Sequence, residues 1–368
     1  MNFEFSEEQN MLREQASAFL RDNCPMSTVR KIVDGDESFD QGLWQKIVEM
    51  GWTATTIPEE YGGLGLSYLE LCVIAEELGR VVAPVPFSSS VYLATEALLR
   101  YGADDVKEAW LGKLAEGTAI GTLATAEQAG QASSSGTGCA MGANGLTGTK
   151  IGVADGDIAS FAIVTAADDA GVSLYLVDLE GSGVSRETVK TLDPSRSHAT
   201  LTFSDAAATL VGEAGQGWDA VADIQDRAAV LFAWEQVGGA KTALDMAKDY
   251  AMERYAFGRP IAGYQAIKHK LANIYVKTTL AESNSYYGAW ALSTDAAELP
   301  LAAATARVAG IQAYQFAASE NIQTHGGMGF TWEFDCQFLY RRARLLSMVI
   351  GGELVWQKKL VAAMRTAA

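Results

Sequence analysis

Few side chains in this sequence are of the types that bind transition metals or act as nucleophiles. The only histidines are His198, His269 and His325, and no two of them stand four residues apart with an acid between them. The four cysteines form no CxxC pair. Zinc sites and cysteine nucleophiles need such ligands or partners at telling spacings. We therefore predict no metal site, and carboxylates and arginines remain as the groups that could carry chemistry.

The charge balance limits the partners of the chain. Its 368 residues include 28 Lys and Arg against 45 Asp and Glu, a formal net charge of −17. A chain this acidic repels phosphate backbones, so nucleic-acid binding is not expected. Residues 1–9 show no secretory signal, and no apolar stretch reaches the length of a membrane span. The scattered cysteines, Cys24, Cys72, Cys139 and Cys336, favour a reducing compartment, so we predict a cytoplasmic protein.

The elements that must position these groups fall into three segments, which predict an α+β fold that is mainly α. Residues 1–117 predict a helical domain that begins with a capping box at Ser6 and Gln9. Residues 118–215 predict a small antiparallel β domain, with strand patterns at 120–125, 160–164, 172–177 and 199–203 and a hairpin turn at Asn144 and Gly145. Residues 216–368 predict long bundle helices over 219–252, 264–290 and 299–322, with a last pair between 341 and 364.

Three strings of residues in this chain resemble signatures of the acyl-CoA dehydrogenase family, in the same order and spacing. They are 58–65 (PEEYGGLG), 254–261 (RYAFGRPI) and 323–330 (QTHGGMGF). The resemblance covers essentially the whole chain. It implies an N-terminal helical domain, a middle antiparallel β-barrel and a C-terminal four-helix bundle that forms an oligomer, a dimer of dimers. It also implies FAD as cofactor, α,β-dehydrogenation of an acyl-CoA thioester, and electron-transferring flavoprotein as the acceptor.

The resemblance further implies that one half of an FAD site is present. In the family, part of each FAD is held by a neighbouring subunit. Arg254 and Phe257 match the positions that reach the pyrophosphate and adenine end, where an Arg fork suits a pyrophosphate and a Phe supplies an apolar wall. The other matching positions are Tyr264, Gln265 and Ile267 on one wall, and Gln323, Gly326 and Gly327 at the corner where the backbone closes on the ADP portion.

The half of the site that would meet the flavin ring departs from the family pattern. Ala126 stands where the family usually has a Thr, so a hydroxyl donor is missing. Gly152 and Ala154 stand where a Trp and a Thr are usual, so a stacking surface and a second hydroxyl are missing as well.

The commonest position for the catalytic base holds no acid. An ungapped count from Arg341 places Ile350 there, and pairing the glycines places Gly351 there. Glu353 lies two or three residues late and is a poor candidate for the base.

Some members of the family carry the base on the first bundle helix, directly before an Arg, and the matching pair here is Asp226 and Arg227. The resemblance thus implies Asp226 as base and Arg227 as a substrate residue. Asp is one methylene shorter than Glu, which moves the carboxylate by more than about 1 Å, and a misplacement on that scale can cost roughly a hundredfold in rate. The alternative is that Asp226 is a helix charge in a salt bridge beside Arg227.

Three functions remain open from the sequence. The chain is a partner subunit of a heteromeric acyl-CoA dehydrogenase that completes the distal end of another chain's FAD, or a homomeric acyl-CoA dehydrogenase with Asp226 as base, or a scaffold that binds neither flavin nor CoA. The first is favoured because one half of the FAD site is kept and the other half is degraded. The sequence does not specify the acyl chain, which depends on the depth of a pocket between helices.

Overall fold

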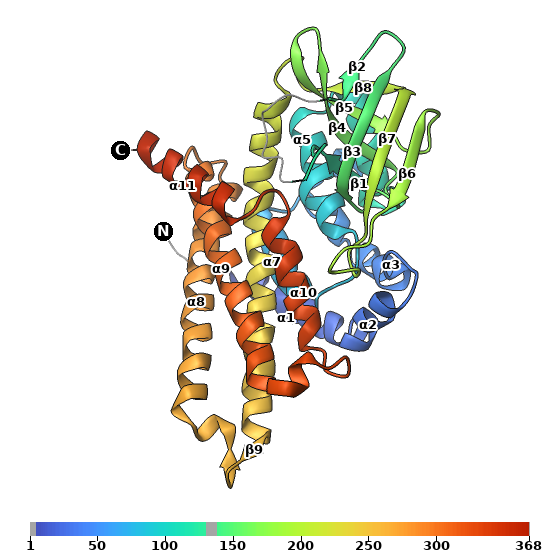
Figure 1. Cartoon of the computed structure of the whole chain (residues 1–368). Coiled ribbons are helices and arrows are strands. Elements are labelled where there is room, and N and C mark those ends of the chain that lie inside the picture. The colour runs from blue at the N-terminus through green and yellow to red at the C-terminus, as the bar shows by residue number, and fades with distance from the viewer. Residues whose placement is uncertain (1–4, 130–137, 368) are drawn as a thin grey trace. The chain divides into compact units, whose positions relative to one another are not determined.

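The computed structural model describes residues 5–129 and 138–367 (Figure 1). The element order is helices, then a sheet, then helices, as the sequence predicts. The chain forms two compact units. We call the described residues of 1–34, 68–83 and 229–368 the helical unit, and those of 35–67 and 84–228 the sheet unit.

The helical unit contains five helices of the second half of the chain and three of the first. Its N-terminal helices are α1 (Glu7–Asn23), α2 (Met26–Asp34) and α4 (Tyr68–Arg80). Its later helices are most of α7 (Gly217–Glu253), α8 (Gln265–Ser293), α9 (Leu299–His325), α10 (Cys336–Met348) and α11 (Glu353–Ala367). Helix α9 packs against α8, α10 and α11, which are orange to red in Figure 1. The capping box at Ser6 and Gln9 is confirmed, with both reciprocal hydrogen bonds formed.

Glycines allow α4 and α7 to cross at close range in the helical unit. A Cβ added to Gly79 would lie 2.0 Å from the carbonyl oxygen of Glu235, and one added to Gly238 would lie 1.9 Å from that of Glu76. Only glycine fits where two backbones approach this closely. Three cations surround Glu76 at this crossing: Arg13 at 3.3 Å, Arg80 at 3.0 Å and Lys241 at 2.8 Å.

The sheet unit contains an eight-stranded sheet with the order β6-β7-β3-β2-β4-β5-β8, and β1 pairs with β4 beside this path. The strands are β1 (Gly121–Ala124), β2 (Ala140–Met141), β3 (Leu146–Ala154), β4 (Phe161–Asp168), β5 (Gly171–Asp178), β6 (Val184–Thr188), β7 (His198–Ala206) and β8 (Ala208–Val211). The turn predicted at Asn144 and Gly145 joins β2 to β3. The prediction of a purely antiparallel sheet is wrong, because β1 and β2 each pair with β4 in parallel. Residues 125–160 connect β1 to β4 by a path long enough for the two strands to run in the same direction.

Short helices cover part of the sheet unit and lead into it. They are α3 (Gln41–Glu49), the 3-10 turns η1 (Trp52–Ala54) and η2 (Glu59–Tyr61), α5 (Glu96–Tyr101) and α6 (Asp104–Ala115). Directly before α5 the chain forms an eight-residue π-helix, η3 (Ser88–Thr95), which is buried throughout. The first part of α7, up to Ala228, also belongs to this unit. No helix in the described ranges has the length and apolar character needed to cross a membrane.

Candidate functional site

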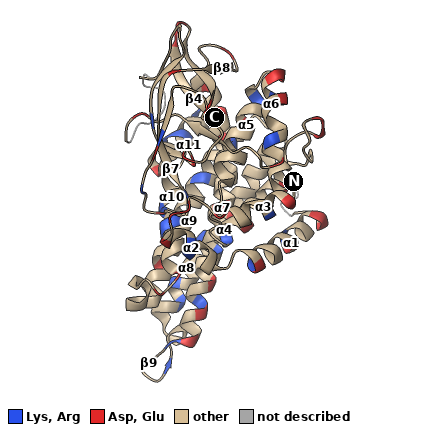
Figure 2. Cartoon of the chain, turned by 90° about the vertical axis from the view of Figure 1, so that its right-hand side faces the viewer, with Lys and Arg blue, Asp and Glu red and all other residues tan. Residues whose placement is uncertain are grey.

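The segment that follows α7 forms a short hairpin with exposed side chains at one end of the helical unit. It consists of β9 (Tyr255–Ala256) and β10 (Arg259–Pro260), and Figure 2 marks basic residues there. Arg254 is exposed and has no side-chain partner among the residues that the structure describes. Phe257 at the tip is 98% exposed, and its φ of +51° is uncommon for a residue with a side chain. The hairpin therefore presents a cation and an aromatic ring outward.

The glycine corner after α9 lies near the same end. His325, the last residue of α9, stacks on Tyr250 of α7 with ring centroids 4.1 Å apart, and Tyr250 precedes Arg254 by about one helical turn. A Cβ added to Gly326 or to Gly327 would meet no atom within 4 Å, so the backbone there is open to a ligand or another chain. Gln323 is exposed beside this corner. The structure thus brings the two predicted segments to one end of one unit.

The predicted wall after the hairpin is held by local contacts. The Tyr264 hydroxyl donates a hydrogen bond to the carbonyl of Ala256 at 2.9 Å, and the Arg259 guanidinium lies 4.0 Å above the Tyr264 ring. Gln265 is exposed and Ile267 is half-buried. A free guanidinium, an exposed Phe and open glycine backbone are together a set that suits the anionic, aromatic ADP end of FAD. We name Arg254, Phe257, Gln323, Gly326 and Gly327 the distal half-site.

The two segments expected to meet the flavin ring, around Ala126 and around residues 152–154, lie side by side in the sheet unit but carry few groups that could bind the ring. The Ile151 amide donates to the Ala126 carbonyl at 2.8 Å, and the Thr122 hydroxyl donates to the Ala154 carbonyl at 2.7 Å. Gly152 has a φ of +59°, and a Cβ added there would meet no atom within 4 Å. The side chains at 126, 152 and 154 therefore supply neither a hydroxyl donor nor a stacking surface, so this half fits an isoalloxazine ring poorly.

Asp226 and Arg227 are both buried on the first part of α7, with 5% and 3% of their surfaces exposed. The Arg227 Nε donates to a carboxylate oxygen of Glu96, the first residue of α5. Glu96 is itself 3% exposed, and the sequence reasoning missed it. No local pattern in the sequence points to this partner, because Glu96 stands 131 residues before Arg227.

A second contact between α5 and α7 lies one turn away. The Tyr101 hydroxyl donates to Asp223 at 2.8 Å, and the Arg100 Nε lies 3.6 Å from the same carboxylate oxygen. Burial and the hydrogen bond to Asp223 raise the pKa of Tyr101. A pocket of about 440 Å³ opens here, lined by Arg100, Tyr101 and Asp219 among others. We call the four charged residues Glu96, Arg100, Asp223 and Arg227 the α5–α7 ladder.

The turn between α10 and α11 holds no acid at the usual position of the base. Ile350 has a φ of +52°, and Gly351 follows with +103°. The buried Arg307 fixes this turn by donating to the carbonyls of Leu346 and of Val349, the latter at 2.8 Å, and burial lowers its pKa to about 9. Glu353 accepts hydrogen bonds from Gln312 at 2.7 Å and Gln357 at 2.8 Å. Its carboxylate is therefore engaged with side-chain amides.

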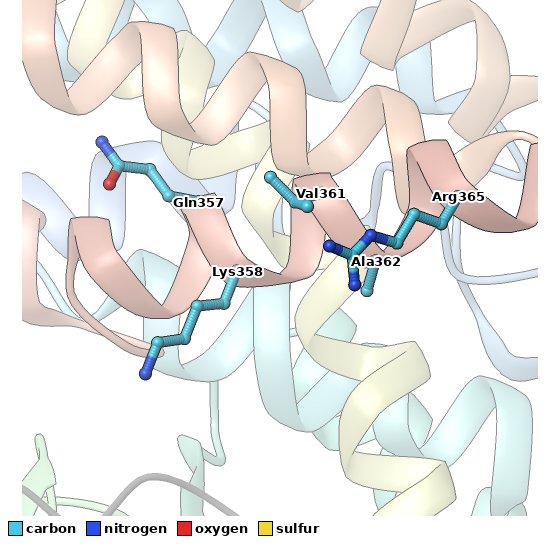
Figure 3. Close-up of a pocket in the computed structure, with 5 residues that line it drawn as sticks. All are labelled: Gln357, Lys358, Val361, Ala362 and Arg365. Atoms are coloured by element: carbon cyan, nitrogen blue, oxygen red, sulfur yellow. The ribbon is translucent and has the colours of Figure 1, made fainter.

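Two further features are separate from the predicted site. The ammonium group of Lys150, which is fully buried, lies 2.6 Å from Glu127 in the sheet unit. Glu127 in turn accepts the amide of Cys139 at 3.0 Å. A pocket of about 350 Å³ lies on α11, and its five lining residues, Gln357, Lys358, Val361, Ala362 and Arg365, include none of the predicted site residues (Figure 3).

Comparison with known proteins identifies the family. Residues 6–118 match the N-terminal domain of acyl-CoA dehydrogenases, and residues 215–364 match the C-terminal domain. The chain is 34% identical to acyl-CoA dehydrogenase IpdE2 of Mycobacterium tuberculosis over 340 residues, which are 92% of this chain and 91% of the relative.

Two solved structures are similar over nearly the whole chain. The ChsE4–ChsE5 complex of Mycobacterium tuberculosis has a TM-score of 0.89 at 25% identity, with 99% of each chain covered. A steroid ACAD described as Tcur3481–Tcur3483 has a TM-score of 0.88 at 26% identity, with 98% of each covered. Both are named for pairs of chains.

Proposed function

Because this chain belongs to the acyl-CoA dehydrogenase family of FAD-dependent oxidoreductases, which act on CH–CH donors, we propose that it is one subunit of a heteromeric member. In this role its distal half-site holds the ADP end of an FAD whose ring is bound by an unlike partner chain. The observation that carries the proposal is the contrast between the two halves. The distal half-site is exposed and free for contact, whereas the segments at 126, 152 and 154 lack the groups that a flavin ring needs.

The residues of the distal half-site each have a defined role in this proposal. Arg254 pairs with the pyrophosphate, and Phe257 covers the adenine end as an apolar wall. The open backbone at Gly326 and Gly327 lets the ADP portion approach closely, as no other residue would. FAD, when bound, accepts the hydride that leaves the β-carbon of the acyl-CoA. Two structures similar to this chain, ChsE4–ChsE5 and Tcur3481–Tcur3483, are named for chain pairs, which supports a heteromer, and the second is named a steroid ACAD.

A second candidate function is that of a homomeric acyl-CoA dehydrogenase with Asp226 as its base. One observation favours it: Asp226 is a buried carboxylate, 5% exposed, directly beside the buried Arg227. In this function Asp226 would remove the α-proton of the thioester, and Arg227 would be a substrate-binding residue.

Flavin stoichiometry tests the heteromer. The chain is purified alone and after co-expression with a complementary family chain that carries the usual Glu, and FAD per chain is measured from absorbance and protein mass. We expect less than one FAD per chain for the chain alone, and one FAD per pair of unlike chains in the complex. A yellow homo-oligomer with one FAD per chain, whose turnover is abolished by Asp226→Asn, would establish the second function instead. A colourless complex, without bound flavin, would favour the third function, a scaffold that binds neither flavin nor CoA.

The finer features of the family belong to the same proposal. They are closure of the sheet into a β-barrel, a four-helix bundle that assembles a dimer of dimers, electron-transferring flavoprotein as acceptor, and a cytoplasmic location. The domain boundaries 1–117, 118–215 and 216–368 are proposed with them.

A further inference from the structure

His325 lies where the two segments of the distal half-site meet. Its ring stacks on the Tyr250 ring of α7, with centroids 4.1 Å apart and an angle of 26° between the ring planes. The ring of Phe334, which precedes α10, meets the His325 ring edge-on at 5.7 Å and the Tyr250 ring at 6.2 Å. Aromatic rings prefer such offset and edge-to-face arrangements. We call Tyr250, His325 and Phe334 the corner stack.

One side of the corner stack is connected to the hairpin through the backbone. The amide of Arg254 donates a hydrogen bond to the carbonyl of Tyr250 at 2.8 Å. The amide of Ile261, which follows β10, donates to the carbonyl of Arg254 at 2.8 Å and closes the base of the hairpin. Contacts on the Tyr250 ring therefore act on the turn of α7 from which the hairpin begins.

The other side of the corner stack is connected to the glycine corner. His325 is the last residue of α9, and the 3-10 turn η5 (Gly326–Phe330) begins directly after it. A Cβ added to Gly329 would lie 3.2 Å from the His325 Cβ and 2.5 Å from the carbonyl oxygen of Ile322, so η5 folds back tightly on the end of α9. The His325 Nδ1 donates to the carbonyl of Asn321 at 2.9 Å. Burial lowers the pKa of His325, so at pH 7 its side chain is an uncharged aromatic surface.

We propose that His325 is a positioning residue for the distal half-site. Its ring holds the Tyr250 ring at one face and the Phe334 ring at its edge, and so keeps the hairpin and the glycine corner in the relative position in which both contact one FAD. His325 is 5% exposed, so it acts through these neighbours and not by contact with the cofactor. The inference rests on the proposed FAD-binding role of the distal half-site, and it applies whether the neighbouring chain is unlike or identical.

The affinity for FAD of three His325 variants tests the proposal. FAD is titrated into the deflavinated oligomer, and the quenching of flavin fluorescence gives the dissociation constant. His325→Ala removes the ring and should weaken binding about 3- to 10-fold, the range expected for the loss of aromatic pairs. His325→Phe keeps a flat ring without the hydrogen bond to Asn321, and it should bind FAD within about twofold of the wild type. His325→Gln keeps a hydrogen-bond donor without a ring, and it should bind as weakly as His325→Ala.

Two further variants complete this set. Tyr287→Leu is the matched control, because it breaks another stacked ring pair, Tyr287 with Trp290, near the end of α8 that is far from the hairpin. We expect it to leave FAD binding unchanged. Tyr250→Leu removes the ring on which His325 stacks and should weaken binding as His325→Ala does. It keeps the test valid if His325→Ala does not fold.

Combination with Arg254→Ala separates positioning from general structural support. If His325 places Arg254 and the glycine corner on the same anion, the double variant should lose less affinity than the product of the two single losses, because residues that act in one network are not additive. Independent losses that multiply in full would overturn the inference. So would His325→Phe that binds as weakly as His325→Ala, or His325→Ala that binds like the wild type while Arg254→Ala binds weakly. If Arg254→Ala also binds FAD like the wild type, the proposed function itself fails, and the inference fails with it.

Discussion

Arg254→Ala gives the most direct test of the distal half-site. Arg254 is exposed and its side chain forms no hydrogen bond or ion pair with the described part of its own chain, so its removal should leave the stability of the helical unit unchanged. A hydrogen bond between charged groups contributes about 1.5–3 kcal/mol, and each 1.4 kcal/mol is tenfold in affinity. We therefore expect FAD to dissociate with a constant about 10- to 100-fold larger. Titration of FAD into the deflavinated oligomer, followed by the quenching of flavin fluorescence, measures this constant.

Lys248→Ala is the control that matches this change in charge. Lys248 lies on α7 less than two turns before Arg254, is half exposed, and pairs with Asp245 at 2.9 Å. Its loss makes the helical unit more negative by one charge without touching the half-site. Salt should weaken the effect of Arg254→Ala, because an exposed ion pair is screened at high ionic strength. The half-site assignment is refuted if Arg254→Ala binds FAD like the wild type, or if Lys248→Ala weakens binding equally.

Three predictions concern buried charges, and for each the free energy of unfolding is measured by urea denaturation. Glu76→Gln should cost about 3–5 kcal/mol at pH 7, as breaking a buried ion pair does. Burial raises the pKa of Glu76, but Lys241, Arg80 and Arg13 outweigh it and hold the pKa below its usual value, so this cost should shrink as pH falls through the pKa of the folded state. Burial raises the pKa of Asp155, so wild type should lose stability relative to Asp155→Asn as pH rises through the folded-state pKa. Lys150→Met should cost about 3–5 kcal/mol by leaving Glu127 uncompensated, and adding Glu127→Leu should recover part of that loss.

Each of these three predictions has an outcome that contradicts it. A Glu76→Gln cost that stays constant as the pH falls from 7 to below the folded-state pKa of Glu76 would show that its carboxylate is not stabilised by the three cations. A wild type that gains stability over Asp155→Asn with rising pH would reverse the direction assigned to that pKa. If the double variant is no more stable than Lys150→Met, the uncompensated carboxylate of Glu127 is not the cause of the stability lost in Lys150→Met.

Much of the fold was predictable because local signals agreed with the packing. The capping box at Ser6 and the turn at Asn144 and Gly145 depend on a few neighbouring residues, and both are confirmed. The parallel pairing of β1 with β4 was not predictable, because 36 residues separate the two strands and no local pattern records which distant edge a strand joins. The π-helix at Ser88–Thr95 was missed for a related reason, since its composition does not differ from that of a buried α-helix.

The candidate site divides in the same way. Arg254 and Phe257 lie in one short contiguous motif and Gly326 in another, so the sequence alone could identify them as candidate site residues. The partner of Arg227 could not be read in this way, because Glu96 lies 131 residues away and reaches it only after α5 and α7 have packed. Buried ion pairs such as this one, and that of Lys150 with Glu127, depend on tertiary neighbours. Their residues look in the sequence like ordinary solvated charges.

The tip of the hairpin argues that the helical unit is built for contact with another chain. Phe257 exposes 98% of its surface, although burying a Phe side chain stabilises a protein by about 1.5–3 kcal/mol. The same residue holds a φ of +51°, and a non-glycine residue in the left-handed region costs on the order of 1 kcal/mol or more. Nothing within the described part of its own chain offsets either cost. Both costs would be offset if a second surface covered the Phe257 ring and held the backbone in place. The exposed guanidinium of Arg254 nearby favours a surface that carries an anion. An FAD bound to a neighbouring chain supplies the anion and the apolar face together, which is why an oligomer that shares its FAD explains this end of the molecule better than an isolated scaffold does.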